Sequence, residues 1–318
     1  MTILITGGAG FIGCHLAQKF LKRGDKVIIV DNFNNYYDPW LKKARIKNLL
    51  NGYDFKLYQV DITNFASLNK IFQNNKIDKI FHLAAQAGVR YSLENPFAYH
   101  NTNTGGTLNI FELAKDYHVE QVVYASSSSV YGGNAKLPFS EDDDTSAPLS
   151  VYAMTKIATE NIAYTYNHLY KIPTTGLRFF TVYGPWGRPD MALFDFTKNI
   201  LAGNTINLHN NGKMKRNFSY IDDIINGCIL AIDKVYDFEI LNLGSDEPVE
   251  LERFVDLIEE NLGKKAMKKL IPMQKGEVIE THADLSKVKE KLGFEPKFKI
   301  EEGIKNFIDW YKRYYKIN

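Results

Sequence analysis

The hydrophobic positions in the first half of the chain follow two alternating patterns. Short runs that are almost wholly apolar have the length and composition of strands covered on both faces. Between them, apolar residues recur three and four positions apart, which is the spacing of an amphipathic helix. These alternating units predict an α/β fold with a doubly wound parallel sheet and helices on both faces. The predicted strands are 1–5, 27–30, 55–60, 79–83 and 121–125, and the predicted helices are 11–23, 64–74 and 95–117.

After residue 185 the pattern becomes less regular and mixes helical stretches with short strands. This change indicates a smaller α/β domain at the C-terminal end of the chain. We expect residues 1–185 to form the first domain, with segments near 217–245 returning to it, and residues 186–216 and 246–318 to form the second. In this half we predict helices at 191–202, 221–234, 251–262, 284–292 and 300–315, and strands at 206–208, 240–243 and 268–271.

The composition is that of an ordinary globular protein. The 318 residues are 45% hydrophobic and 24% charged, and the net charge of +2 gives no reason to expect a nucleic-acid partner. No apolar run reaches the roughly 18 residues of a membrane span, and the chain begins directly with a strand rather than a signal peptide. We therefore expect a cytoplasmic protein in which Cys14 and Cys228 are buried free thiols.

Three glycines stand between the first strand and the first helix, at Gly7, Gly10 and Gly13. The N-terminus of a helix presents free N–H groups and the positive end of the helix dipole, which suit a dinucleotide pyrophosphate. Glycine allows the tight turn and the close approach of phosphate to backbone. The spacing alone is a weak signal, but with its strand and helix it predicts a Rossmann-type site that includes Phe11 and Ile12.

The next polar positions extend this site along the ends of the strands. Asp31 ends the second strand, eighteen residues beyond Gly13, where a carboxylate can accept both ribose hydroxyls of an adenosine. Because a carboxylate would also repel a 2′-phosphate, Asp31 favours NAD over NADP; the alternative is a solvated turn acid. Ligands of open parallel sheets bind at the carboxyl ends of the strands. By that rule we add to the cofactor site Asn32, Asp61, Ile62, Leu83, Ala84, Ala85 and Gln86.

Tyr152 and Lys156 are spaced so that both side chains lie on one face of a helix. A tyrosine with its ordinary pKa of about 10 is a poor base at neutral pH, and lowering that value by ~3 units takes ~4 kcal/mol. A neighbouring ammonium and the positive ring of NAD⁺ can supply this stabilisation. Tyr152 could then take a proton from a hydroxyl while hydride leaves the same carbon, with a serine of 126–129 bound to the oxygen. A surface Tyr–Lys pair is the alternative.

These segments together resemble the extended short-chain dehydrogenase/reductases, in the branch of nucleotide-sugar epimerases, and the resemblance covers nearly the whole chain. It implies that Ser127, Tyr152 and Lys156 form the catalytic set and that Asn103 and Phe179 contact NAD. It also implies that Thr181 faces the substrate and that Arg216 binds the nucleotide diphosphate. Asn217 stands where the family usually has Asp.

The residues around the serines distinguish sub-families. Dehydratases and decarboxylases of this class carry acids where this chain has Ser128 and Ser129, which favours plain epimerisation. Segments 35–38, 85–92, 183–192 and 272–278 resemble those of UDP-glucuronate 4-epimerases. The carboxylate of such a substrate would bind Ser128, Ser129, Arg90 and Arg188, and its nucleotide would lie near Gln274 and Glu277, although both arginines could instead be ordinary surface residues.

The resemblance implies transient oxidation at C4 by tightly bound NAD, rotation of the 4-keto sugar and return of the hydride, interconverting UDP-glucuronate and UDP-galacturonate. The alternatives are an epimerase for UDP-glucose or UDP-N-acetylglucosamine and, less favoured, a UDP-glucuronate decarboxylase. A homodimer that pairs helices 95–117 and 152–170 is also implied. We expect no metal, because the seven histidines are dispersed without ligand spacing.

Overall fold

The computed structural model describes residues 1–134 and 136–317. Over these residues the main element is a seven-stranded sheet in the order β11-β6-β5-β4-β1-β2-β3, with every neighbouring pair parallel. This arrangement confirms the predicted doubly wound α/β class. The strands are β1 (Thr2–Thr6), β2 (Lys26–Asp31), β3 (Lys56–Gln59), β4 (Lys79–His82), β5 (Gln121–Ser127), β6 (Thr174–Phe179) and β11 (Phe238–Leu243).

Two hydrophobic cores cover the two faces of this sheet. Because side chains alternate along a strand, Ile3 and Ile5 of β1 join one core while Leu4 joins the other. The first core receives α1 (Phe11–Arg23) and α9 (Ile221–Asp233), and α2 (Pro39–Leu49) packs on α1. The second core receives α3 (Phe65–Gln73), α6 (Thr107–Asp116) and α7 (Val151–Tyr170).

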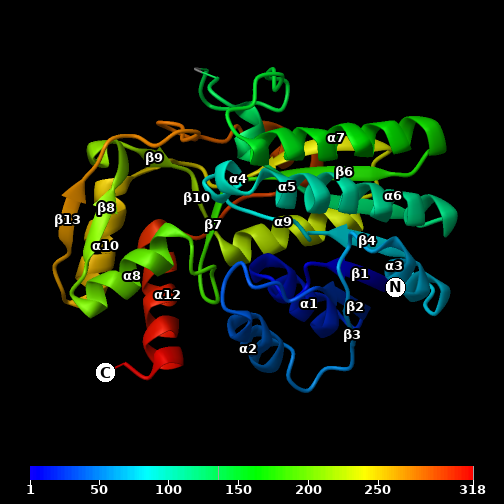
Figure 1. Ribbon diagram of the computed structural model, residues 1–318, viewed down its shortest axis with the longest axis horizontal. Coiled ribbons are helices and arrows are strands. Elements are labelled where there is room, and N and C mark those ends of the chain that lie inside the picture. The colour runs from blue at the N-terminus through cyan, green and yellow to red at the C-terminus, as the bar shows by residue number, and fades with distance from the viewer. Residues whose placement is uncertain (135, 318) are drawn as a thin grey trace.

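The smaller part of the molecule lies beside the sheet, at the left of Figure 1. Its helices α8 and α12 pack on α10, β8 of the parallel pair β8–β13 lies against α8, and α11 packs instead on β11 and α9. Two further pairs, β7–β10 and β9–β12, connect this part to the sheet region. Its elements are α8 (Ala192–Ala202), α10 (Leu251–Leu262), α11 (Ser286–Leu292), α12 (Ile300–Tyr315), β7 (Thr181–Tyr183), β8 (Thr205–Leu208), β9 (Lys215–Arg216), β10 (Phe218–Tyr220), β12 (Val249–Glu250) and β13 (Met267–Leu270).

The return of β11 to the edge of the sheet agrees with the expectation that a late segment rejoins the first domain; the domain boundaries themselves stay a prediction. Within the described residues no helix is both long and apolar enough to cross a membrane.

Two elements differ from the sequence-based expectation. The helical stretch predicted over 95–117 is confirmed, but it is not one α-helix: the chain forms α5 (Pro96–Tyr99), a π-helix over His100–Gly106 and then α6 without a gap. The wider π turn places Gly106 directly against Ile62, where a Cβ would lie 2.4 Å from that side chain. The helix α2 was missed because its buried face carries Lys42 and Arg45 in place of an apolar stripe.

Candidate active site

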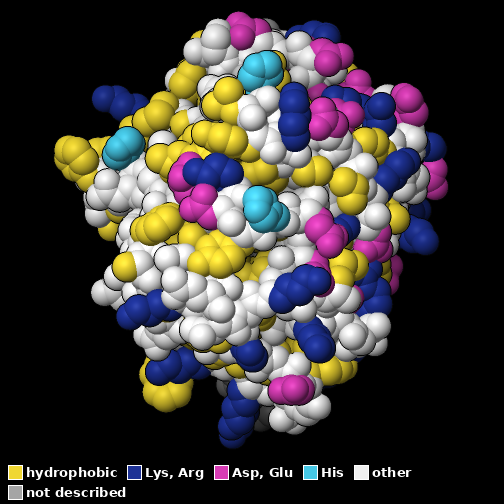
Figure 2. Space-filling view, turned by 90° about the vertical axis from the view of Figure 1, so that its right-hand side faces the viewer, with side chains coloured by type: hydrophobic (Ala, Val, Ile, Leu, Met, Phe, Trp, Pro, Cys, Tyr) yellow, Lys and Arg dark blue, Asp and Glu magenta, His cyan; other side chains and the backbone are white. Residues whose placement is uncertain are grey.

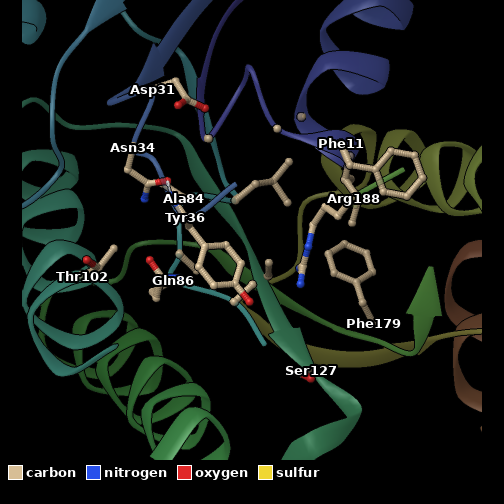
Figure 3. Close-up of a pocket in the computed structure, with 18 of the residues that line it drawn as sticks. Phe11, Asp31, Asn34, Tyr36, Ala84, Gln86, Thr102, Ser127, Phe179 and Arg188 are labelled. Carbon is tan, nitrogen blue, oxygen red and sulfur yellow. Dashed lines mark hydrogen bonds between the residues drawn. The ribbon is translucent and has the colours of Figure 1, made fainter. Parts of the chain in front are cut away.

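A cavity with an empty volume of about 1300 Å³, part of it open to solvent, lies at the carboxyl ends of β1, β2, β4, β5 and β6. Figure 3 shows side chains from both halves of the chain pointing into it. Most of the predicted site residues lie here although they are scattered over the sequence. Those that line the cavity are Gly7, Gly10, Phe11, Ile12, Gly13, Asp31, Asn32, Ile62, Leu83, Ala84, Ala85, Gln86, Ser127, Tyr152, Lys156, Phe179 and Arg188.

The glycine turn forms one wall by backbone contact. Gly7 has a φ of +68°, and a Cβ on it would lie 2.8 Å from the amide nitrogen of Ala84. A Cβ on Gly13 would lie 2.3 Å from the carbonyl oxygen of Gly7. No side chain caps the start of α1, so its first N–H groups have neither an intrahelical nor a capping partner. These groups suit an anionic ligand.

Asp31 is buried and firmly held. Its Oδ2 accepts from the amide of Ala9 at 3.2 Å, and its Oδ1 accepts from the amide of Phe33 at 2.8 Å. The same Oδ1 accepts from Lys42 Nζ at 2.9 Å. Lys42 lines the cavity and neutralises the carboxylate, yet sequence reasoning missed it because it lies on the unrecognised helix α2.

Two predicted cofactor residues lie outside the lining of the cavity. Asp61 accepts from Asn32 Nδ2 at 2.8 Å; burial acts to raise the pKa of Asp61, but hydrogen bonds from Asn32 and Thr63 outweigh burial and lower it. Asn103 is buried behind Gln86. Its Oδ1 accepts from the backbone amide of Gln86 at 2.7 Å, and its Nδ2 donates to the carbonyl of Gln86 at 3.0 Å. Asp61 and Asn103 therefore hold Asn32 and Gln86, two residues that line the cavity, in place.

Tyr152 and Lys156 lie on α7, which begins after Ser150 because the Ser150 hydroxyl accepts from the amide of Ala153. Lys156 Nζ donates to the carbonyl of Ala125 at 2.7 Å and lies 6.0 Å from the centre of the Tyr152 ring. Burial lowers the pKa of Lys156 to about 8, against the opposing charge of Glu160.

Burial raises the pKa of Tyr152 above its ordinary value. A hydrogen bond with Ser127 and the positive charge of Arg188 oppose this effect. The arginine is thus a second cation beside the phenol, in addition to the lysine that the sequence pattern identified.

An ion pair that sequence reasoning missed lies behind this set. Arg178 on β6 donates through Nε and Nη2 to the two oxygens of Glu160, both at 2.9 Å. The Ser126 hydroxyl donates to the same carboxylate at 2.5 Å. Since all three residues are buried, the network fixes α7 against the ends of β5 and β6.

Arg188 extends from the loop after β7 into the cavity, with its guanidinium directed to the side where Ser127 lies (Figure 3). Its Nε and Nη2 donate to the two oxygens of Asp190 at 3.0 and 2.6 Å. Asp190 also accepts from the Tyr36 hydroxyl at 3.2 Å. Nη1 of Arg188 has no partner within the described part of the chain. Asn34, Tyr36 and Thr102 line the cavity and were also missed.

A second cluster lies outside the cavity lining, on the predicted nucleotide side. Glu277 forms an ion pair with Arg90 at 3.2 Å and a hydrogen bond with Nδ1 of His209 at 3.1 Å, and it accepts from the backbone amide of Gln274 at 3.1 Å. Burial lowers the pKa of Arg216, with Glu277 opposing and Arg90 adding to the effect. The structure thus brings together four predicted residues and adds His209, which had no sequence signal.

The remaining predicted substrate residues flank the cavity without lining it. Ser128 and Ser129 begin a 3-10 turn directly after β5. The Ser127 hydroxyl donates to that of Ser129 at 3.1 Å and accepts from its amide at 3.2 Å. Thr181 starts β7 and donates its amide to the carbonyl of Asn217. The side chain of Asn217 donates to the carbonyl of Ser245 and accepts from its amide, both at 2.7 Å.

Residues 3–244 match the NAD dependent epimerase/dehydratase family. The chain belongs to this family. The residues of the cavity fit the NAD of this family. The free N–H groups at the start of α1 suit a pyrophosphate, and the carboxylate of Asp31 suits the hydroxyls of a ribose. The buried Nε2 of Gln86 has no partner among the described residues.

Relatives within the family are similar over almost the whole chain. An uncharacterized protein of Methanocaldococcus jannaschii is 53% identical over 97% of this chain and 95% of its own length. UDP-glucuronate 4-epimerase 4 of Arabidopsis thaliana is 46% identical over 99% of this chain and 76% of its own. The solved UDP-glucuronic acid 4-epimerase of Bacillus cereus, in complex with UDP-glucuronic acid and NAD, has a TM-score of 0.93 and 34% identity, with 99% and 100% of the chains covered.

Proposed function

We propose that this protein is a UDP-glucuronate 4-epimerase that interconverts UDP-glucuronate and UDP-galacturonate. The observation that carries the proposal is the place of Arg188, whose guanidinium enters the cavity beside Tyr152 and whose Nη1 has no partner among the described residues. A neutral hexose has no need of a partly buried cation there, whereas a C6 carboxylate does. The names of the similar plant and Bacillus proteins support the same substrate.

The residues that would hold NAD are those of the glycine turn, Asp31 with Lys42, and Gln86. When bound, NAD supplies a ring that can accept a hydride from sugar C4 and give it back to either face. The turn closes on backbone atoms of Gly7 and Gly13, and Asp31 is held by three donors. Such a site favours a cofactor that stays bound through repeated cycles, in keeping with a reaction that consumes no NAD overall.

Tyr152 is the proposed base for the 4-hydroxyl, with Ser127 hydrogen-bonded to the reacting oxygen. Because burial raises the pKa of the free phenol, the base form depends on nearby positive charge. Arg188 provides this charge, and we assign the same role to Lys156, whose ammonium lies 6.0 Å from the centre of the Tyr152 ring and is oriented by the carbonyl of Ala125. The proton taken by Tyr152 would stay on its oxygen until the sugar oxygen needs it again.

The carboxylate of the sugar must also be controlled. After oxidation at C4 the substrate is a β-keto acid, which loses CO₂ when its C5–C6 bond aligns with the carbonyl π system. We assign Arg188, Ser128 and Ser129, with Thr181 beside them, to hold the carboxylate ionised and out of this alignment. The missing acid at Ser128 and Ser129 removes the group that would assist elimination or decarboxylation.

The nucleotide of the substrate must stay bound in one position while the 4-keto sugar rotates. We assign this role to Arg216 for the diphosphate and to the cluster of Gln274, Glu277 and Arg90 around it. The sequence analysis expected Arg90 at the sugar carboxylate, but Arg90 pairs with Glu277 outside the cavity lining, so we assign it to this cluster. The Arg90–Glu277 pair joins loops 187 positions apart and ties the sheet region to the substrate loops. A fixed nucleotide leaves rotation about the diphosphate linkage as the motion that exposes the other face of C4.

We also propose that the protein acts in the cytoplasm as a homodimer that pairs α6 and α7 with a second copy. Leu108, Tyr164 and Leu169 are 43, 56 and 59% exposed on these helices, whereas Tyr166 of α7 is buried in the core. Figure 2 views the side on which α6 and α7 end and shows apolar side chains in small groups among charged ones.

The test replaces Arg188 with Met and compares substrates. Because Asp190 would be left unpaired, the double variant Arg188→Met, Asp190→Asn is measured beside it. In both variants the loss in kcat/KM for UDP-glucuronate should exceed the loss for UDP-glucose by about 10- to 100-fold, the value of a hydrogen bond to a charged group. A loss common to both sugars reports the positive charge that Arg188 places beside Tyr152. An exposed arginine elsewhere, Arg253→Met, is the control.

Equal losses for both sugars would contradict the assigned role of Arg188. Mass spectrometry of the products separates the alternatives, since a decarboxylase releases CO₂ and leaves a UDP-pentose. A preference for UDP-glucose over UDP-glucuronate in the wild type would favour the neutral-sugar epimerase instead.

A further inference from the structure

Arg45 on α2 is a completely buried cation that has no acidic partner among residues 1–134 and 136–317. Its guanidinium donates to four neutral oxygens: the carbonyls of Trp186, Gly187 and Ala9 at 2.9, 3.2 and 3.4 Å, and the Tyr37 hydroxyl at 2.7 Å. No carboxylate of the described residues lies within salt-bridge distance. Burying an unpaired charge is costly, so a negative charge from outside the chain would stabilise this arrangement.

One of these hydrogen bonds reaches the glycine turn. Ala9 lies between Gly8 and Gly10, at the entrance to α1, and its carbonyl faces Arg45 while Gly7 and Gly10 line the cavity. The turn therefore separates Arg45 from the cavity by a single layer of backbone. The uncapped N-terminus of α1 adds the positive end of its dipole at the same place. The back and the front of the turn are thus both electropositive.

Two other hydrogen bonds reach the segment that carries Arg188. Trp186 adopts a φ of +66°, which is rare for a residue with a side chain. Its carbonyl is held by Arg45, and its ring packs against Trp310 and Tyr314 at centroid distances of 5.1 and 4.9 Å. Arg45 also holds the carbonyl of Gly187, the residue immediately before Arg188. The backbone conformation immediately before Arg188 is therefore held by hydrogen bonds from the planar guanidinium of Arg45.

We propose that Arg45 is a positioning residue that joins the two ligand sites. The diphosphate of the dinucleotide is its counter-charge across the glycine turn, and its bonds to Trp186 and Gly187 set the place of Arg188. The second half of this statement rests on the proposed uronate substrate, while the first half is independent of the sugar. The cofactor site and the carboxylate site are then coupled through one guanidinium.

Substitutions of Arg45 separate its two roles, as a positive charge behind the glycine turn and as a donor to the carbonyls before Arg188. A lysine at position 45 keeps the positive charge near the turn but cannot hold two carbonyls with a planar fork. Methionine fills a similar space with neither charge nor donors. The exposed Lys47 on the same helix provides a matched control, because Lys47→Met removes a charge that has no contact with the turn.

The first measurement uses the NAD content of the purified variants and, after removal of NAD, calorimetric binding of ADP. ADP carries a diphosphate and no sugar substrate, so this arm tests Arg45 without reference to the reaction. Arg45→Met should bind ADP about tenfold more weakly and retain less NAD, whereas Arg45→Lys should stay within about threefold of the wild type. Lys47→Met should match the wild type in both.

The second measurement uses UDP-glucuronate with saturating NAD. Arg45→Lys should raise KM about tenfold with a smaller effect on kcat, since the carboxylate site is displaced while the catalytic set remains. Wild-type ADP affinity in Arg45→Met would overturn the counter-charge role, and unchanged KM in Arg45→Lys would overturn the link to Arg188. If Arg45→Met does not fold, Arg45→Gln replaces it in the ADP measurement under the same two criteria.

Discussion

The two walls of the cavity are built in different ways. The cofactor wall consists of the turn over residues 7–13, Asp31 and the segment 83–86, and it presents mainly backbone and small side chains. The proposed substrate wall consists of Arg188, which lines the cavity and pairs with Asp190, and it continues outside the lining in the cluster of Arg90, Gln274, Glu277 and Arg216. All of these are charged or polar side chains. The first wall suits a permanent occupant, and the second suits one that must turn and leave.

The difference also lies in how the partners are spaced along the chain. The cofactor wall depends on contacts such as Ala9 with Asp31, 22 residues apart and at the ends of adjacent strands. The substrate wall depends on pairs such as Tyr36 with Asp190 and Arg90 with Glu277, 154 and 187 residues apart. A wall built from neighbouring backbone segments can be predicted from a local sequence pattern. A wall built from side chains far apart in the sequence gives little pattern from which to predict it.

The largest expected effect lies where the two walls meet. Tyr152→Phe removes the proton acceptor but keeps the ring, which packs edge-on against Tyr99 at 6.1 Å. Turnover should fall on the order of 10²- to 10⁴-fold, the usual contribution of general base catalysis, while NAD content and thermal stability stay at wild-type values. Turnover within tenfold of the wild type would show that another group accepts the proton.

A glycine substitution tests whether the cofactor wall depends on backbone approach. In Gly13→Ala the new methyl group would lie 2.3 Å from the carbonyl oxygen of Gly7, so the turn must shift. We expect most of the bound NAD to be lost and the unfolding free energy to fall by roughly 1–3 kcal/mol, as for an overpacked core. Gly105→Ala, where the methyl group meets open space, is the control. Normal NAD content in Gly13→Ala would contradict the close-packed turn.

The smallest effect concerns the buried ammonium beside Tyr152. Burial lowers the pKa of Lys156 to about 8 in the folded protein, against 10.5 for the ordinary side chain. Between these values the unfolded chain binds more protons than the folded one, so this group makes the protein more stable as pH rises. In NAD-free protein the unfolding free energy of the wild type, relative to Lys156→Met, should rise by about 1–2 kcal/mol from pH 8 to 9.5.

Urea unfolding at several pH values measures this difference, and a difference that does not change with pH would contradict a lowered pKa for Lys156. The comparison with Lys156→Met cancels the titration of other groups that both proteins share. The difference between the two unfolding free energies therefore reports the titration of Lys156 alone.

Sequence patterns predicted the sheet and the cofactor wall because their signals are local. Apolar runs gave six of the seven sheet strands, including β11, and the glycine spacing located the turn at the start of α1. The helix α2 was missed for a physical reason: its inward face carries Lys42 and Arg45, which have neutral or acidic partners in place of apolar ones. The same polar face supplies Lys42 to the cavity.

The substrate wall was predicted only through the family resemblance, and only in part. Arg188, Glu277 and Arg216 were identified, but Tyr36 and His209 were not, because each takes its role from a partner more than 60 residues away. Asp190 was also missed, although it pairs with Arg188 two positions before it, because that spacing carries no signal. The ion pair of Glu160 with Arg178 was missed although the two lie 18 residues apart, since nothing in their spacing distinguishes a buried pair from two solvated charges.

The proposed reaction stores a hydride from C4 of UDP-glucuronate on bound NAD and returns it to the same carbon. To test this, the purified protein is incubated with UDP-glucuronate and no added NAD, after its NAD content has been determined. We expect many turnovers per bound NAD, with UDP-galacturonate as the product and no UDP-pentose. Absence of UDP-galacturonate from NAD-loaded protein, or its replacement by a UDP-pentose, would show that the protein is not a UDP-glucuronate 4-epimerase.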